Sequence, residues 1–122
     1  MKKIILTFLL VIGTFLLQAQ TWTANDMNGV SYDLANFTNK ATIVDISAHW
    51  CGPCWSWHTS GIMEELYHDF GPDGTDEFMV FFIDGDAGSS VSLLNGGSGS
   101  VGNWVTGTPY PLIGPNGQGA SV

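Results

Sequence analysis

The sequence predicts an α/β fold built around one strand–helix–strand unit. Two apolar stretches with the character of buried strands, 42–48 and 78–83, flank a helix-like stretch, 53–70. Nearly continuous apolar runs of this length are typical of parallel strands buried on both faces, and we expect 42–48 to be a central strand. Parallel strands need a long crossover, which is expected to be right-handed.

Residues 1–20 have the pattern of a secretory signal peptide. A basic start, Met1-Lys2-Lys3, is followed by an apolar run over 4–17 and the exit Gln18-Ala19-Gln20. The run is shorter than the roughly 20 residues that cross a bilayer, although an uncleaved anchor is an alternative. No cysteine directly follows it, which argues against a lipoprotein signal. We expect cleavage near Gln20 and export to an oxidising periplasm or to the outside of the cell.

Charge excludes several classes of partner. The chain carries 11 acidic and 3 basic side chains, a formal net charge of −8 at pH 7. Two of the three lysines lie in the predicted signal peptide, so Lys40 alone remains in the expected domain, 21–122. Binding to nucleic acid is excluded, because phosphates need cationic partners, and binding to an anionic membrane surface is equally disfavoured.

Residues 21–40 are predicted to form a hairpin or an extended lead-in to the core. Asn28-Gly29 is a strong turn signal, with Val30 and Tyr32 beyond it.

The stretch 53–70 has helical periodicity. Pro53 suits the first turn, where its missing N–H is not needed, and Gly71-Pro72 is a typical helix end. Gly61 is a position where the helix could kink. One apolar face recurs at spacings of three and four residues: Ile62, Met63, Leu66, Tyr67 and Phe70.

Beyond residue 84 the composition changes. Residues 85–103 are rich in Gly and Ser and predict a flexible loop, with at most a short helix over 90–94. A C-terminal segment, 104–122, follows. The acidic turns 73–77 and 84–86 lack the spaced ligand pattern of a calcium loop, so we interpret them as solvated turns.

The two cysteines of the chain lie in Trp50-Cys51-Gly52-Pro53-Cys54. Thiols at this spacing can close and reopen a small disulfide loop, which is the requirement of a thiol–disulfide exchange centre. At the start of a helix, the Cys51 sulfur faces unpaired backbone N–H groups and the positive end of the helix dipole, which favour the thiolate. We therefore predict Cys51 as the nucleophile and Cys54, one turn further on, as the resolving thiol.

Two other readings of the cysteines stay open. His49 and His58 could complete a zinc site, but all four ligands would come from the stretch 49–58 and no second Cys-x-x-Cys motif exists. An inert structural disulfide is the other alternative, although so short a loop restricts the unfolded chain little. We expect a redox-active disulfide and neither a metal nor another cofactor.

The stretch 41–54 resembles the strand and active-site helix of the thioredoxin superfamily, and Trp-Cys-Gly-Pro-Cys is a motif of that family. The resemblance implies a thioredoxin-like fold, a central mixed sheet flanked by helices. The family's last strand and helix have no counterpart before residue 122, so we expect a piece of a longer protein. Within 21–122 the expected parts are the lead-in 21–40, the core 41–84, the loop 85–103 and the segment 104–122.

The resemblance implies a role for Asp45, which stands six residues before Cys51. Members of the family carry a buried carboxylate there that assists proton transfer to the resolving cysteine. Asp45 alternates in phase with Ile43 and Ser47, and burial would raise the pKa of its carboxyl. The alternative is a solvated strand residue.

The resemblance also implies substrate contacts. Pro109 is the candidate for the family's cis-proline, which lies opposite the disulfide; alternatively that proline lies beyond residue 122. The expected substrate-contacting residues are Trp50, Gly52, Pro53 and Trp55.

The site departs from the family in its lack of cations. Trp55 stands where a lysine or arginine often follows the second cysteine, and 78–84 lacks the lysine expected near the carboxylate. His58 could tune a cysteine pKa or be half-exposed. Trp55 and Trp57 could line a docking surface or belong to the core.

Together these features predict an exported thiol–disulfide oxidoreductase that exchanges disulfides with protein substrates. The Gly-Pro pair between the cysteines resembles the reducing members of the family, so we expect a reductant that draws electrons from a membrane protein. The alternative is a redox-inert, thioredoxin-like binding module of a larger secreted protein.

Overall fold

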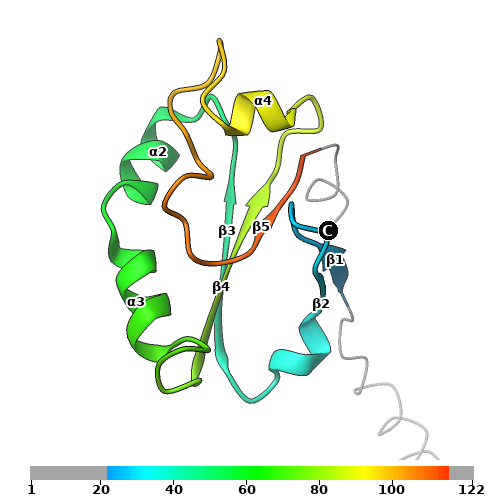
Figure 1. The fold of residues 1–122 in the computed structure, drawn as a ribbon, viewed down its shortest axis with the longest axis vertical. Coiled ribbons are helices and arrows are strands. Elements are labelled where there is room, and N and C mark those ends of the chain that lie inside the picture. Colours follow the sequence, from blue (N-terminus) through cyan, green and yellow to red (C-terminus); the bar gives the residue numbers. More distant parts are fainter. Residues whose placement is uncertain (1–21, 116–122) are drawn as a thin grey trace, which may run out of the picture.

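The computed structural model of the protein describes residues 22–115, so the predicted signal peptide lies outside the described residues. No helix within 22–115 has the length and hydropathy to cross a membrane. The elements follow in the order β1 (Thr23–Asn25), β2 (Ser31–Asp33), η1 (Leu34–Phe37), β3 (Ala41–Ser47), α2 (Gly52–His58), α3 (Ile62–Phe70), β4 (Phe78–Asp84), α4 (Val91–Leu94) and β5 (Leu112–Ile113) (Figure 1).

The main sheet is parallel, with the order β3-β4-β5. β3 pairs with β4 over its full length, from Ala41 opposite Phe78 to Ser47 opposite Asp84. β5 is short and adds only two pairs to the other side of β4. The predicted strand–helix–strand unit is confirmed. The strand that would make the sheet mixed is not found among residues 22–115.

β3 lies at an edge of this sheet, so the prediction of a central strand buried on both faces is wrong for the described residues. Ile43 packs into the core beneath the helices. On the other face Val44 is 41% exposed and Ile46 is 65% exposed. The strand therefore has one buried face and one exposed face, and apolar side chains lie on both.

The predicted helix 53–70 is two helices, α2 and α3, separated at 59–61. Gly61 caps the start of α3 with φ 77°, a left-handed conformation that glycine adopts without strain. The position expected to permit a kink is thus a full break. α3 ends at Gly71, whose N–H donates to the Tyr67 carbonyl, as the Gly71-Pro72 signal predicts.

Two layers of apolar side chains cover opposite faces of β4, and Figure 1 shows α2 and α3 on one side and the N-terminal hairpin on the other. The β1–β2 hairpin around Asn28-Gly29 is confirmed. Phe81 is fully buried beneath it and makes edge-to-face contacts with Trp22, Tyr32 and Phe37, with centroid distances of 5.3–5.6 Å. The helix-side core contains Met63, Val80, Phe82, Leu94, Trp104, Tyr110 and Leu112.

Candidate functional site

The disulfide Cys51–Cys54 lies at the start of α2, with the two Cα atoms 5.2 Å apart. Cys51 is the N-cap residue, and its sulfur accepts a hydrogen bond from the Cys54 N–H at 3.3 Å. Gly52 and Pro53 are exposed, while Cys54 packs against the helix-side core. The local sequence thus places the outer cysteine where unpaired N–H groups converge and the inner one against apolar side chains.

The segment 100–104 packs beside this helix, and three of its groups bond to one carbonyl oxygen just before the helix. The His49 carbonyl oxygen accepts three hydrogen bonds, from the Val101 N–H (2.9 Å), the Ser100 hydroxyl (3.1 Å) and the Trp104 indole N–H (3.3 Å). Gly102 lies so close to Trp55 that an added Cβ would sit 2.2 Å from its ring. The glycine at 102 is therefore required by close packing, a role that the Gly/Ser composition of 85–103 did not predict.

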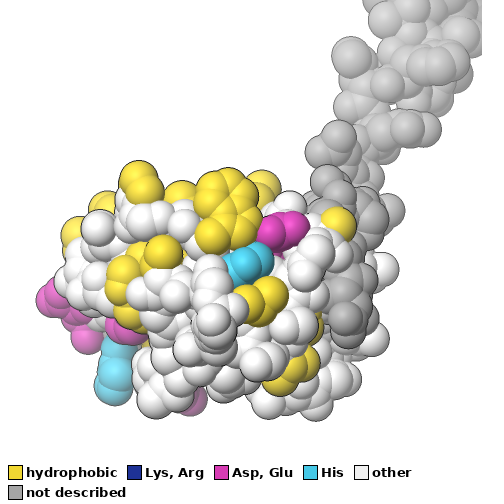
Figure 2. All heavy atoms as spheres, turned by 90° about the horizontal axis from the view of Figure 1, so that it is seen from above, with side chains coloured by type: hydrophobic (Ala, Val, Ile, Leu, Met, Phe, Trp, Pro, Cys, Tyr) yellow, Lys and Arg dark blue, Asp and Glu magenta, His cyan; other side chains and the backbone are white. Residues whose placement is uncertain are grey.

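Trp50 is held beside the disulfide by an acidic side chain. Its indole N–H donates to Asp86 at 2.8 Å, while the ring stays 60% exposed. Asp86 also accepts the Gly88 N–H, which lowers the pKa of its carboxyl, and the Trp50 bond lowers it further. His49 is buried and its Nδ1 lies 2.8 Å from the Ser89 hydroxyl. Figure 2 shows this end of the molecule, where large hydrophobic side chains lie beside a histidine and no lysine or arginine is visible.

Asp45 shares the helix-facing side of β3 with Ile43, as the alternation predicts. One carboxylate oxygen accepts the Ser47 hydroxyl at 2.9 Å. The other is buried and has no hydrogen-bond partner among residues 22–115. Burial raises the pKa of the Asp45 carboxyl, an effect that the Ser47 hydrogen bond partly offsets. This is not the environment of a solvated strand residue, and a role in proton transfer remains a prediction.

His58 is buried, 6% exposed, and is not the half-exposed helix histidine of one expectation. Its ring stacks on Trp55, with centroids 5.4 Å apart, and lies 5.1 Å from the Trp104 ring. Burial lowers the pKa of the imidazole, although Glu64 and Asp45 oppose that shift. His58 is therefore a neutral group inside the aromatic cluster.

A short hydrogen-bond chain joins His58 to α3, and nothing in the sequence pattern singled it out. The Tyr110 hydroxyl lies 3.3 Å from His58 Nδ1 and donates to Glu64 Oε1 at 3.2 Å. Burial, with Glu64 nearby, strongly raises the pKa of Tyr110. Tyr110 comes from a segment 52 residues away from His58, so only the tertiary fold brings them together.

The two histidines of the zinc alternative, His49 and His58, contact different residues. His49 contacts Ser89 and lies 3.7 Å from Asp86, whereas His58 contacts Thr108 and Tyr110. Within 22–115 no three His, Cys, Asp or Glu side chains are grouped so that they could hold a metal ion. The four candidate ligands are thus not brought together.

Pro109 is not the cis-proline expected opposite the disulfide. In residues 22–115 the cis peptide bond joins Gly114 to Pro115. Pro109 lines a small cavity with Tyr67, His68 and Asp73, residues in the last turns of α3 and just beyond it. The Thr108 hydroxyl, directly before Pro109, donates to the Trp104 carbonyl at 2.8 Å.

Of the two tryptophans that follow the cysteines, Trp55 belongs mainly to the core and Trp57 to the surface. The Trp55 ring packs edge-on against Trp104 with centroids 5.0 Å apart. Trp57 is 47% exposed. The exposed aromatic surface near the disulfide is therefore provided by Trp50 and Trp57, and the substrate contact expected of Trp55 is restricted by its packing.

No protein-family model and no curated protein sequence matches this chain. Solved structures do resemble it. One is a solution structure from Bacteroides thetaiotaomicron, assigned as a protein disulfide isomerase, with a TM-score of 0.58 and 21% identity over 84% of this chain and 58% of that one. Another is a crystal structure from Chlorobium tepidum, assigned as the thiol:disulfide interchange protein DsbE, with a TM-score of 0.53 and 19% identity over 84% of this chain and 64% of that one.

A third is a solution structure from Neisseria meningitidis, assigned as a thioredoxin, with a TM-score of 0.53 and 15% identity over 78% of this chain and 56% of that one. The chain thus spans 56–64% of the length of these three structures. At such identities the likeness concerns the fold. Residues 22–115 adopt an α/β thioredoxin-like fold with the Cys51–Cys54 disulfide at the start of α2.

Proposed function

We propose that this chain is a thiol–disulfide oxidoreductase that exchanges disulfides with protein substrates through Cys51 and Cys54. The observation that carries the proposal is the position of the disulfide, with the Cys51 sulfur as the N-cap group of α2. Backbone N–H groups at a helix start stabilise a thiolate, which is the reactive form of the thiol. Cys54 lies inward, against the core, where it is suited to resolve a mixed disulfide.

In the reduced protein, the Cys51 thiolate attacks one sulfur of the substrate disulfide and displaces the other as a thiolate. Cys54 then loses its proton and attacks the Cys51 sulfur. This step releases the second substrate thiolate and closes the Cys51–Cys54 disulfide, so two electrons have passed to the substrate. Asp45 is the proposed proton acceptor for Cys54, because burial raises the pKa of its carboxyl toward that of a thiol.

We further propose that the chain works as an exported reductant supplied with electrons by a membrane protein. The Gly-Pro pair between the cysteines supports this direction, and one similar structure is assigned as a thiol:disulfide interchange protein. The pattern of residues 1–20 supports export. A reductant in an oxidising compartment would otherwise stay oxidised.

The reduction potential of the Cys51–Cys54 pair tests this proposal. Protein beginning at residue 21 is equilibrated in dithiothreitol redox buffers, and its free thiols are trapped and counted. A reversible two-electron transition near about −270 mV, the value of thioredoxin itself, supports a reductant, whereas a value above about −150 mV indicates an oxidase or isomerase. A disulfide that resists reduction until the chain unfolds rules out the enzyme. The variant Cys54→Ser, which cannot close the disulfide, is the control for trapping.

A redox-inert binding module is the second candidate. The observation in its favour is the exposed aromatic surface of Trp50 and Trp57 around the disulfide. Exposed aromatic side chains are common in surfaces that bind other proteins. The same measurement separates the candidates, because a binding module needs no reversible disulfide.

A further inference from the structure

An exposed tryptophan and a carboxylate lie together beside the disulfide. Trp50 directly precedes Cys51, and its indole N–H donates to Asp86 at 2.8 Å. The bond fixes one edge of the indole, yet the residue stays 60% exposed. Much of the ring is therefore open to a bound protein, while its position is set by Asp86.

The Asp86 carboxylate can accept further hydrogen bonds. One of its oxygens accepts the Gly88 N–H and the other accepts the Trp50 indole, both at 2.8 Å, although each carboxylate oxygen has about two acceptor positions. The side chain is 29% exposed. The Gly88 bond, and after it the Trp50 bond, lower the pKa of this carboxyl, so it is ionised at neutral pH. Asp86 thus places a negative charge at the edge of an exposed ring.

No lysine or arginine within 22–115 neutralises this charge. Lys40, the one such residue in that range, is paired with Asp76. His49 Nδ1 lies 3.7 Å from the Asp86 carboxylate and closer, at 2.8 Å, to the Ser89 hydroxyl. His49 is buried, so it approaches Asp86 from inside the protein and leaves the solvent side open. Figure 2 shows an acidic side chain next to a large hydrophobic one at this end of the molecule.

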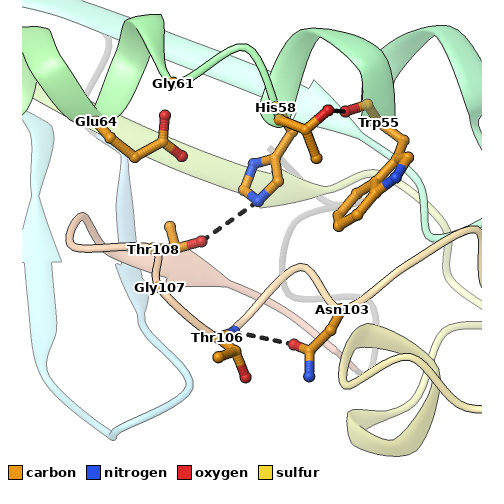
Figure 3. A pocket seen from close by; sticks show the side chains of 9 residues that line it. Trp55, His58, Gly61, Glu64, Asn103, Thr106, Gly107 and Thr108 are labelled. Carbon is orange, nitrogen blue, oxygen red and sulfur yellow. Dashed lines mark hydrogen bonds between the residues drawn. The ribbon is translucent and has the colours of Figure 1, made fainter.

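The other tryptophan and carboxylate near the disulfide, Trp55 and Glu64, are not accessible in this way. Both lie at the depression between α2, α3 and the segment 103–108 (Figure 3). The Trp55 ring packs against His58 and Trp104, with centroids 5.4 and 5.0 Å away. One Glu64 oxygen accepts the Tyr110 hydroxyl and the other is buried. The pair described above is therefore the accessible one.

The combination of an exposed indole and a carboxylate at its edge favours a guanidinium group. A cation is attracted to the face of a tryptophan ring, even at an exposed site. A guanidinium is also planar, so it can stack on the ring while its N–H groups donate to the neighbouring carboxylate. The ammonium group of lysine is a strongly hydrated point charge without a flat face, so it suits this arrangement less well.

We propose that Trp50 and Asp86 form a subsite for an arginine side chain that lies close to the cysteine in the protein whose disulfide is exchanged. The proposal rests on the proposed function. Because Trp50 is the neighbour of Cys51, the subsite lies directly beside the attacking sulfur. An extended substrate advances about 3.3 Å per residue, so an arginine about one to three residues from the attacked cysteine reaches the ring. Asp86 determines specificity in this role and takes no part in the transfer of electrons.

Binding is measured first without any exchange. The oxidised protein is titrated with a peptide that has serine in place of cysteine and an arginine two residues away on either side. The matched peptide carries citrulline, which has nearly the shape of arginine without its charge. The indole N–H signals are followed by NMR. We expect the Trp50 signal to shift with the arginine peptide and not with the citrulline peptide, while the signal of the buried Trp104 stays in place with both. Equal Trp50 shifts with both peptides, or none with either, overturn the subsite.

The reaction is then measured with disulfide-containing forms of the same two peptides. We expect kcat/KM to be about fivefold higher for the arginine peptide, as for an exposed cation–π contact and ion pair. In Asp86→Asn, which keeps an acceptor oxygen for the Trp50 indole, the ratio should fall toward one. In Glu65→Gln, which removes the same charge from an exposed position of α3, the ratio should persist.

Two results with these variants would overturn the subsite. An equal fall of the ratio in Asp86→Asn and Glu65→Gln means that the overall negative charge of the protein favours arginine. An unchanged ratio in Asp86→Asn means that this carboxylate does not contact the arginine.

Failure of the subsite and failure of the proposed function have different signatures. If neither disulfide peptide is reduced, the exchange activity is absent, whereas the serine peptides still report on the subsite. If both peptides are reduced at equal rates by the wild-type protein, the activity stands and the subsite falls. This wild-type comparison does not depend on whether the variants fold.

Discussion

Substituting Gly102 by alanine should destabilise the protein through the contact between 100–104 and α2. A Cβ at position 102 would lie 2.2, 2.4 and 2.5 Å from the Trp55 ring atoms Cζ2, Cε2 and Cη2. Carbon atoms pack at about 3.5 Å, so the ring or the backbone has to move by roughly 1.3 Å. The ring has little room, because it packs against Trp104 and His58 with centroids 5.0 and 5.4 Å away.

If the backbone moves instead, the hydrogen bonds from Ser100 and Val101 to the His49 carbonyl weaken. Each such bond contributes about 1 kcal/mol, and overpacking a core by a methyl group costs about 1–3 kcal/mol. We therefore expect the free energy of unfolding of Gly102→Ala to be about 1–3 kcal/mol lower than that of the wild type. Such a loss moves the midpoint of urea unfolding down by about 1 M.

The assay is urea unfolding of the oxidised protein, followed by tryptophan fluorescence. Gly52→Ala is the matched control, because a Cβ there meets no atom within 4 Å and the residue lies at the start of α2. Its midpoint should stay at the wild-type value or rise slightly. A Gly102→Ala midpoint within error of the wild type would contradict the packing of 100–104 against Trp55.

Three further predictions concern titration and positioning. Asp45→Asn should raise the free energy of unfolding at neutral pH. Burial raises the folded-state pKa of Asp45, so the stabilisation from its protonated carboxyl is full below the usual Asp pKa and is lost as pH rises through the folded-state pKa. The neutral amide avoids that loss. Urea midpoints against pH measure this, and a constant difference between variant and wild type would contradict it. The imidazole of His58 should titrate below pH 6.5 in NMR, and its burial in the neutral form should make the protein less stable as pH falls through 6.5, because the unfolded state then binds the proton. A midpoint at or above 6.5 would show that the carboxylates of Glu64 and Asp45 outweigh the effect of burial on this pKa. Asp86→Ala should free the Trp50 ring, which donates to that carboxylate, and raise KM for a protein disulfide while the reaction with dithiothreitol is unchanged; equal KM values would mean that Trp50 needs no such positioning.

The parts of the fold that sequence predicts are those encoded locally. The Asn28-Gly29 turn, the end of α3 at Gly71 and the apolar run 78–83 of β4 each depend on neighbouring residues, and each is present. The Cys-x-x-Cys motif is equally local, since Pro53 and the helix periodicity after it place the disulfide at a helix start. These signals predict the strand–helix–strand unit that positions the disulfide.

The parts that the sequence did not predict depend on contacts between distant segments. Glycine is frequent both in mobile linkers and where two segments approach closely, so composition alone could not predict the close packing of Gly102 against Trp55. The burial of His58 depends on Trp104 and Tyr110, which come from a distant segment of the chain. The edge position of β3 follows from strand order, which hydropathy does not encode.

The three hydrogen bonds to the His49 carbonyl also bear on how the protein folds. They connect segments 51 to 55 residues apart in the chain, so the entropy of closing a long loop is spent before they form. The β3–α2 region, in contrast, is continuous in sequence and can acquire local structure early. The contacts of the cysteine pair within β3–α2 thus need little loop closure, whereas its contact with the segment 100–104 requires closing a loop of about 50 residues.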